Sequence, residues 1–173
     1  MRKQPSFLGV LVVLVVVAGL LVWWIGSLTN SDGLWFLRVF NSQADWIAIY
    51  WDGGTYMLFP EDAAYEEVMS AFNDAVAHWV GYEEDAELPA DRLEHYRAEG
   101  RLLELHYNMS VQVHTRHSYP RARSFFVPLD GTDADWRRIF AGWGDTPRVG
   151  VLNGSEARFA HLFTTVEQAV PGY

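Results

Sequence analysis

The feature that most constrains this chain is a run of 19 residues, 7–25, without any charged, amide or hydroxyl side chain. Fourteen of these residues are Leu, Ile, Val or Phe, and together they favour insertion into a bilayer by about 4 to 8 kcal/mol. A helix of this run is about 28 Å long, close to the roughly 30 Å hydrocarbon thickness of a membrane. The run therefore predicts a transmembrane helix.

A cleaved secretory signal peptide is the competing interpretation of this run. The apolar core of a signal peptide has about 7 to 15 residues and leads to a cleavage site of small residues. Here the run is longer and ends with Trp23 and Trp24, and tryptophan is enriched where a spanning helix meets the lipid headgroups. We therefore expect a retained anchor. A lipoprotein is excluded because the chain has no cysteine to acylate.

Positive charge flanks the run on one side, where Arg2 and Lys3 precede it. Because Lys and Arg mark the cytoplasmic side of a spanning helix, we expect a single-pass protein of the cell membrane with its N-terminus in the cytoplasm. The predicted organisation is a cytoplasmic segment at 1–6, the helix at 7–25, a short tether at 26–33 and one extracytoplasmic domain at 34–173.

The composition of the outer part excludes several classes of protein. All 22 acidic residues follow position 30, against 11 arginines and no lysine, so this part has a formal charge near −11 and repels nucleic acid. The absence of cysteine excludes thiol nucleophiles, thiolate metal sites and disulfides. Because Lys3 is the only lysine, a Ser–Lys pair or a Schiff-base lysine is excluded from the outer domain.

Helical and strand patterns both occur in the outer domain. Apolar spacings of three and four predict helices at 61–79 and 155–170, and Gly100 ends a shorter helix predicted at 89–99. Runs of β-branched and aromatic residues predict strands at 34–40, 46–51, 55–59, 102–108, 110–115, 124–129, 136–140 and 148–152. Because short turns join most of them, the expected fold is α+β, with an antiparallel sheet covered on one face by helices.

The most concentrated positive patch lies at 114–123, and its candidate ligand-binding residues are Arg116, His117, Arg121 and Arg123. Guanidinium groups bind carboxylate and phosphate bidentately, so the patch indicates a site for an anionic cell-wall ligand or a lipid headgroup. The alternative is a solvated loop whose arginines pair with the acidic helices. His106, His114 and His117 have the residue type of zinc ligands, but a His-x-x-His in a loop is common without metal, and no metal is expected.

Two acidic clusters were considered as sites. Asp130, Asp133 and Asp135 bring three carboxylates into six residues, but their spacing differs from that of the EF-hand loop, which predicts an ordinary turn. The acidic residues within 83–87 have the chemistry of a glycosidase acid and base, yet neighbouring loop carboxylates more commonly only face solvent. No cofactor is expected.

These observations favour a membrane-anchored binding or accessory domain of the cell envelope that does not catalyse a reaction. Its expected partners are the membrane, through 7–25, and an envelope protein or an anionic cell-wall ligand, with no nucleic acid. Two alternatives stay open. One is a small hydrolase that uses Asp or Glu together with His, with Asp130, Asp133, His114 and His117 as candidates. The other is an extracytoplasmic sensor of an anionic ligand.

Overall fold

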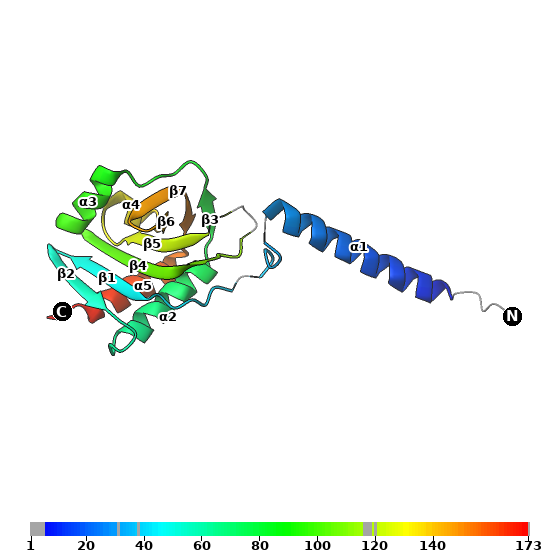
Figure 1. The fold of residues 1–173 in the computed structure, drawn as a ribbon, viewed down its shortest axis with the longest axis horizontal. Coiled ribbons are helices and arrows are strands. Elements are labelled where there is room, and N and C mark those ends of the chain that lie inside the picture. The colour runs from blue at the N-terminus through cyan, green and yellow to red at the C-terminus, as the bar shows by residue number, and fades with distance from the viewer. Residues whose placement is uncertain (1–5, 31, 38, 116–118, 120, 173) are drawn as a thin grey trace. The chain divides into compact units, whose positions relative to one another are not determined.

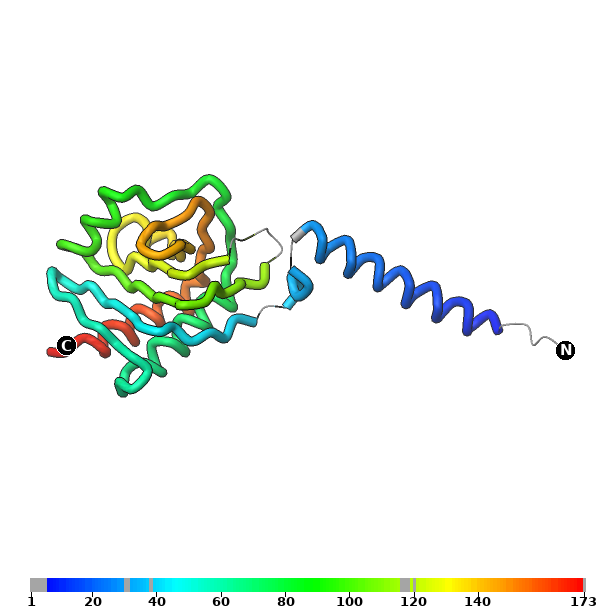
Figure 2. Tube along the Cα trace, in the orientation of Figure 1, coloured from blue at the N-terminus to red at the C-terminus, as the bar shows by residue number. Residues whose placement is uncertain are grey.

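The computed structural model describes residues 6–30, 32–37, 39–115, 119 and 121–172. These residues cluster into two compact units, one within 1–37 and 114–118 and the other within 38–113 and 119–173. Figure 1 shows the elements of both units and Figure 2 the path of the chain. Each unit is described separately below.

The first unit is dominated by one long helix, α1 (Phe7–Asn30). Its span Phe7–Thr29 is long and apolar enough to cross a membrane, and it is the one such helix in the described part of the chain. This confirms the apolar helix predicted at 7–25. The helix continues a little beyond that run. Ser27 and Thr29 are compatible with it because their hydroxyl groups donate hydrogen bonds to the carbonyls four residues earlier and so add no unpaired polar group.

A turn at residues 32–37, here called the post-helix turn, follows α1. The predicted strand at 34–40 is wrong, since 33–36 form a turn and 37, 39 and 40 have no regular structure. The carboxylate of Asp32 accepts the Leu34 backbone N–H at 2.8 Å, and the N–H of Leu37 bonds the carbonyl of Leu34, also at 2.8 Å. These local hydrogen bonds satisfy the backbone that a strand would have paired with a neighbour.

The second unit contains a seven-stranded antiparallel sheet with the strand order β2-β1-β4-β5-β6-β7-β3. Its strands are β1 (Trp46–Trp51), β2 (Gly54–Leu58), β3 (Gly81–Glu83), β4 (Arg101–Val111), β5 (Ala122–Pro128), β6 (Arg138–Trp143) and β7 (Thr146–Asn153). Its helices are α2 (Tyr65–Ala77), α3 (Ala90–Ala98), α4 (Gly131–Asp135) and α5 (Glu156–Ala169). The predicted α+β class with an antiparallel sheet is confirmed.

The larger core lies between one face of the sheet and the pair α2 and α5, which are drawn on the same side of the sheet in Figure 1. Ile47 and Ile49 of β1 point into this core and are fully buried. They meet Phe72 of α2 and Leu162 of α5, which are also fully buried. The predicted apolar stripes of the two helices are therefore core stripes.

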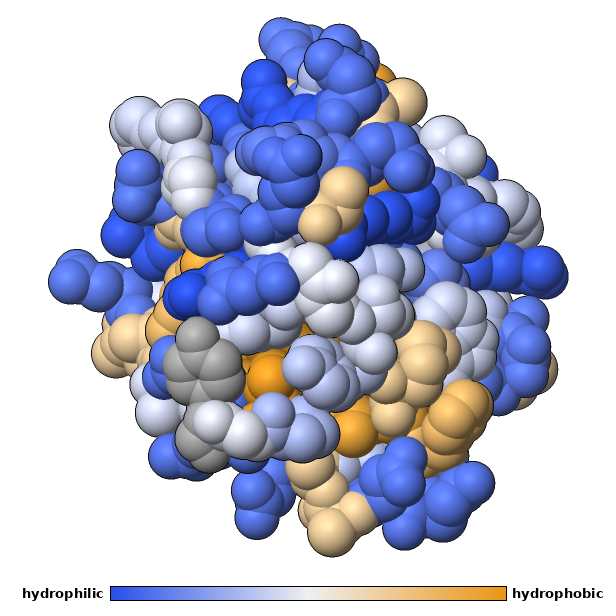
Figure 3. All heavy atoms as spheres, turned by 90° about the vertical axis from the view of Figure 1, so that its left-hand side faces the viewer, coloured by the Kyte–Doolittle hydropathy of each residue, from blue (hydrophilic) through white to orange (hydrophobic). Residues whose placement is uncertain are grey.

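The other face of the sheet carries a smaller apolar cluster beneath α3. Leu93 and Tyr96 of α3 pack with Leu102, Phe126 and Phe140 of the sheet. This cluster covers part of a face that the sequence analysis left uncovered. Seen from the side of the β1–β2 turn, hydrophilic side chains predominate on the surface and hydrophobic atoms show as small areas (Figure 3).

Three elements differ from the predicted ones. The strand expected at 102–108 continues to Val111 as β4, with a register shift between His106 and Val111. Of the strand expected at 110–115, only 110–111 belong to β4, and 112–115 have no regular structure. The acidic stretch after Gly81 contributes β3, which pairs with β7 at the sheet edge. The expected turn at 130–135 contains the short helix α4.

Candidate functional site

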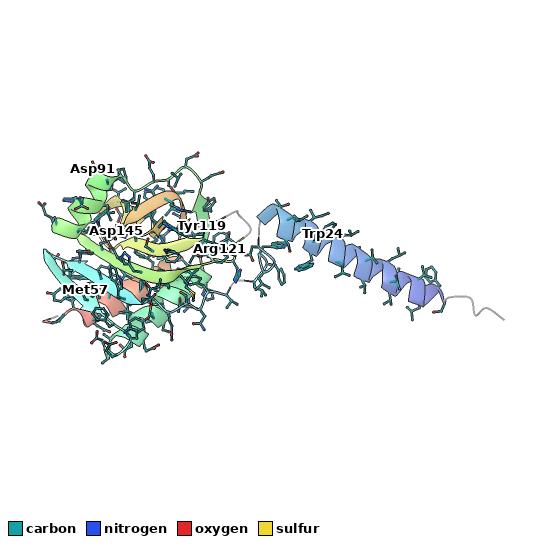
Figure 4. All side chains as sticks on the ribbon, in the orientation of Figure 1. Trp24, Met57, Asp91, Tyr119, Arg121 and Asp145 are labelled. Carbon is teal, nitrogen blue, oxygen red and sulfur yellow. The ribbon has the colours of Figure 1, made fainter. Side chains whose placement is uncertain are left out.

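Two of the four candidate residues of the predicted anion patch, Arg121 and Arg123, belong to the described part of the chain. Arg116 and His117 lie outside the described residues. Arg121 precedes β5 and is exposed, and Figure 4 shows it close to Tyr119. Arg123, on β5, is exposed as well. No carboxylate of the described residues pairs with either arginine, so the acidic pairing that the solvated-loop alternative requires is not found for these two.

Arg123 instead lies over the ring of Trp143 at the end of β6, with its guanidinium carbon 4.6 Å from the ring centroid. Arg148 of β7 approaches the same ring at 5.0 Å. Trp143 is 43% exposed. Stacking on an aromatic face holds a guanidinium in place while leaving its edge N–H groups available. Two arginine side chains therefore contact one partly exposed indole.

A second aromatic pair lies near this group, across β1 and β4. Trp46 and His106 are directly opposite in the strand register, and their rings stack with centroids 3.6 Å apart and planes 11° from parallel. His106 is 7% exposed. This stack belongs to the face of the sheet that also carries α3, because it alternates with Ile47 on the opposite side.

The two aromatic groups line a common hollow of about 260 Å³, called here the Trp46–Trp143 hollow. Its lining residues are Asp45, Trp46, His106, Tyr107, Asn108, Arg123, Trp143 and Gly144. The volume is slightly below the roughly 300–1,000 Å³ of typical small-molecule sites, so the hollow suits only a small group, of about the size of one sugar ring.

The acid in this hollow, Asp45, is already bonded. Its two carboxylate oxygens accept the backbone N–H of Asn108 at 2.6 Å and the Asn108 side-chain N–H at 2.5 Å. These bonds attach the segment before β1 to the middle of β4, at its register shift. Asp45 therefore fixes the rim of the hollow, while Arg123 supplies its unpaired charge.

The ring of His106 contacts a buried acid, Glu104. Its Nε2 lies 3.1 Å from Oε2 of Glu104, which is 1% exposed. Arg97 of α3 donates from Nε to the other oxygen of Glu104 at 2.7 Å. Burial alone would lower the pKa of Arg97, but its bonds to Glu104 and Glu94 raise the pKa above its ordinary value, so Arg97 stays positively charged beside Glu104.

The buried Glu104 also determines which histidine nitrogen faces a ligand. Nε2 of His106 faces a carboxylate oxygen, which is a hydrogen-bond acceptor, and this geometry suits the tautomer with its proton on Nε2. Nδ1 is then an acceptor, and no described residue donates a hydrogen bond to it. Ser124, opposite His106 in the register, is fully buried and donates its hydroxyl proton to the carbonyl of Gly144 at 2.5 Å. Because this hydroxyl is buried and its proton is donated to a carbonyl, Ser124 is not positioned to act as a nucleophile.

The carboxylates considered for hydrolysis have structural partners. Asp133 is fully buried and accepts hydrogen bonds from Arg138 at 2.9 Å, Tyr96 at 3.0 Å and Arg92 at 3.2 Å. Burial raises its pKa, but these three bonds outweigh that effect and hold the pKa below its ordinary value. Burial raises the pKa of Asp130, which lies at the start of α4.

The histidine candidates for catalysis lie in a different unit from these acids or outside the described residues. His114 belongs to the first unit, where its Nδ1 lies 2.9 Å from the carboxylate of Asp32. Within the described part of the chain, no group of three or more His, Asp or Glu side chains is arranged to hold a metal ion.

No protein-family model, curated protein or solved structure matches this chain. The function therefore has to be argued from its own residues.

Sequence reasoning found Arg123 but missed the residues around it. Trp143 and Arg148 belong to the β6–β7 hairpin. This hairpin lies beside β5 because β6 pairs with β5, with Ser124 opposite Gly142. No local sequence pattern predicts that pairing. Glu104 and His106 did leave a signal. Two polar residues at spacing two in the apolar stretch Leu102–Tyr107 must share one face of a strand, and such a pair in a buried strand marks a polar site.

Proposed function

We propose that this chain is a single-pass membrane protein whose domain binds an anionic ligand of the cell envelope, a carboxylated or phosphorylated sugar, without converting it. The observation that carries the proposal is the pair of arginines stacked on Trp143. Arg123 and Arg148 have no carboxylate partner among the described residues, although the domain is strongly acidic. An anion is the natural partner for such oriented guanidinium groups.

The sugar part of the ligand is inferred from the aromatic groups. Indole faces pack against the apolar faces of sugar rings. Trp46 lines the hollow and has one face on His106, so its other face is the one offered to a sugar, whereas the ring of Trp143 is contacted by Arg123 and Arg148. Asn108 and the Nδ1 of His106 supply polar groups of the kind that orient a hydroxylated ligand. The combination favours an acidic sugar over a simple carboxylate.

Calorimetry on the full-length protein in nanodiscs tests this proposal, with glucuronate, glucose 6-phosphate, glucose and acetate as probes. We expect an acidic sugar to bind more tightly than glucose or acetate, and binding to weaken as salt is raised. Arg123→Gln should weaken binding by about tenfold, the value of one charge-assisted hydrogen bond. Arg158→Gln is the matched control, since Arg158 pairs with Asp74 on α2. Equal affinity for glucose and glucuronate would contradict the proposal.

The membrane topology is part of the same proposal. We infer from Arg2 and Lys3 that the N-terminus is cytoplasmic and the domain extracytoplasmic. Carbonate washing should leave the full-length protein in the membrane, and protease added to intact cells should digest the domain. Release of a shortened soluble form would contradict the anchor, and protection from protease would contradict the orientation.

One observation favours a hydrolase as the second candidate function. The bond between Glu104 and His106 resembles the arrangement by which a carboxylate orients a histidine base, and Nδ1 faces no protein donor. The residues first considered, Asp130 and Asp133, have no such arrangement. Release of reducing sugar from acidic glycan fragments, abolished by His106→Gln, would establish hydrolysis and overturn the non-catalytic proposal.

A further inference from the structure

The post-helix turn folds back against the end of α1. The indole of Trp35 lies directly over Gly26, where an added Cβ would be 2.6 Å from the ring. Trp23 donates from its indole N–H to the carbonyl of Gly33 at 3.0 Å. Glycine is thus required at position 26 for the indole to approach the helix backbone this closely.

These contacts place the turn at a defined depth along α1. The stretch from Phe7 to Gly26 makes a helix of about 30 Å, which equals the hydrocarbon thickness of a typical bilayer. If α1 spans the membrane, Gly26 lies at the outer boundary of the hydrocarbon. Trp35 packs on it, so the turn lies where aromatic residues are enriched at membrane interfaces.

The turn exposes apolar side chains at this depth. Leu34 is 46% exposed, Phe36 is 51% exposed and Leu37 is 38% exposed. Its backbone is internally bonded through Leu34 and Leu37, and its acid, Asp32, is paired with His114. Because Asp32 and the N–H groups of Leu34 and Leu37 already have partners in the protein, these groups add little to the cost of placing the exposed apolar side chains in the headgroup region.

We infer that the post-helix turn is a second membrane-binding element, whose apolar side chains insert into the lipid at the outer boundary. The occupant of this surface is lipid because the turn is continuous with the lipid-exposed surface of α1. The inference rests on the proposed membrane anchor. It assigns residues 32–37, expected from sequence to belong partly to a free tether, to the membrane interface.

The absence of cysteine from the chain allows a direct test with single labels. Full-length Phe36→Cys and Val17→Cys are labelled with bimane and reconstituted into vesicles of phosphatidylcholine, with lipids brominated either near the top or near the end of the acyl chain. Val17 is in the middle of α1 and reports the anchor. The exposed Val149 of β7, as Val149→Cys, reports the domain.

We expect bromines near the top of the acyl chain to quench the label at position 36 and bromines near the chain end to quench the label at position 17. Adding Gly26→Leu should abolish the quenching at position 36 by displacing Trp35, while the label at position 17 stays quenched. Quenching at 17 without quenching at 36 overturns the inference and leaves the anchor intact. An emission at 36 that is blue-shifted but unquenched also overturns it, because protein then covers the turn. Loss of quenching at 17 refutes the anchor itself.

Discussion

Replacing Asp133 by Asn tests the buried charge cluster beside α4. The side chain is fully buried and receives three hydrogen bonds, two of them from arginines. Asn keeps one acceptor oxygen but removes the charge. Arg138 retains a second partner in Glu83, and the side chain of Arg92 is 46% exposed and so reaches water. Because neither arginine is left as an uncompensated buried charge, we expect a loss of about 1 to 3 kcal/mol, below the roughly 3 to 5 kcal/mol of breaking a fully buried ion pair.

The pH dependence of this loss follows from the direction of the pKa shift. The pKa of Asp133 is lower in the folded protein than its ordinary value, so ionisation stabilises the fold above about pH 4, the pKa of an unfolded aspartate. That stabilisation disappears as the pH falls through the lower folded pKa. The difference between the wild type and Asp133→Asn should therefore be largest near neutral pH and shrink in acid.

Urea unfolding of the full-length protein in micelles, followed by tryptophan fluorescence at neutral and acidic pH, measures this difference. A loss of about 1 to 3 kcal/mol is measurable against the roughly 5 to 15 kcal/mol of a typical domain. Asp91→Asn is the matched control, because Asp91 on α3 is exposed and points away from the domain (Figure 4). A midpoint unchanged by Asp133→Asn, or a loss of the same size at every pH, would refute the reasoning.

Two further predictions concern packing. Phe72→Ala should cost about 3 to 5 kcal/mol and Leu162→Ala about 2 to 5 kcal/mol, because both side chains are fully buried between the sheet and the helix pair; unmoved urea midpoints would contradict their place in the core. Gly142→Ala should destabilise the domain by about 1 to 3 kcal/mol, because the added methyl would lie 2.8 Å from the carbonyl oxygen of Thr146 and would also meet the ring of Phe126; a stability equal to that of the wild type in the same titration would contradict the close approach of β6 to its turn.

The local spacing of apolar residues was enough to predict the helices α2 and α5, each of which buries one apolar face against the sheet. The stripes containing Phe72 and Leu162 repeat at helical spacing over several turns, and burial of those stripes decides both helices. The same local reasoning failed at 34–40. Its apolar and aromatic residues satisfy the strand pattern, but Trp35 packs on a helix glycine, and Asp32 bonds the backbone that a strand would pair. Contacts with residues just before this stretch, Gly26 and Asp32, thus overrode its strand preference.

The candidate site shows the same limit in a different way. Arginine clustering identified Arg123, whereas Trp143 became part of the site only through the pairing of β5 with β6. The acidic stretch at 83–87 was expected to face solvent. Glu83 instead bonds Arg138, which lowers the pKa of the carboxyl, and so secures β3 at the sheet edge. Partners of this kind depend on register, which composition does not determine.

The arginines of the domain serve two distinct purposes. Arg97 and Arg138, near α3 and α4, form ion pairs with buried or half-buried carboxylates. Their charge is therefore neutralised within the protein, where it attaches helices to the sheet. At the other group, Arg123 and Arg148 contact the ring of Trp143 and no described carboxylate. In a domain with about twice as many acids as arginines, an arginine without an acid partner is unexpected from composition. The site for an anion is therefore best sought at Trp143, where positive charge is oriented but not neutralised by the protein.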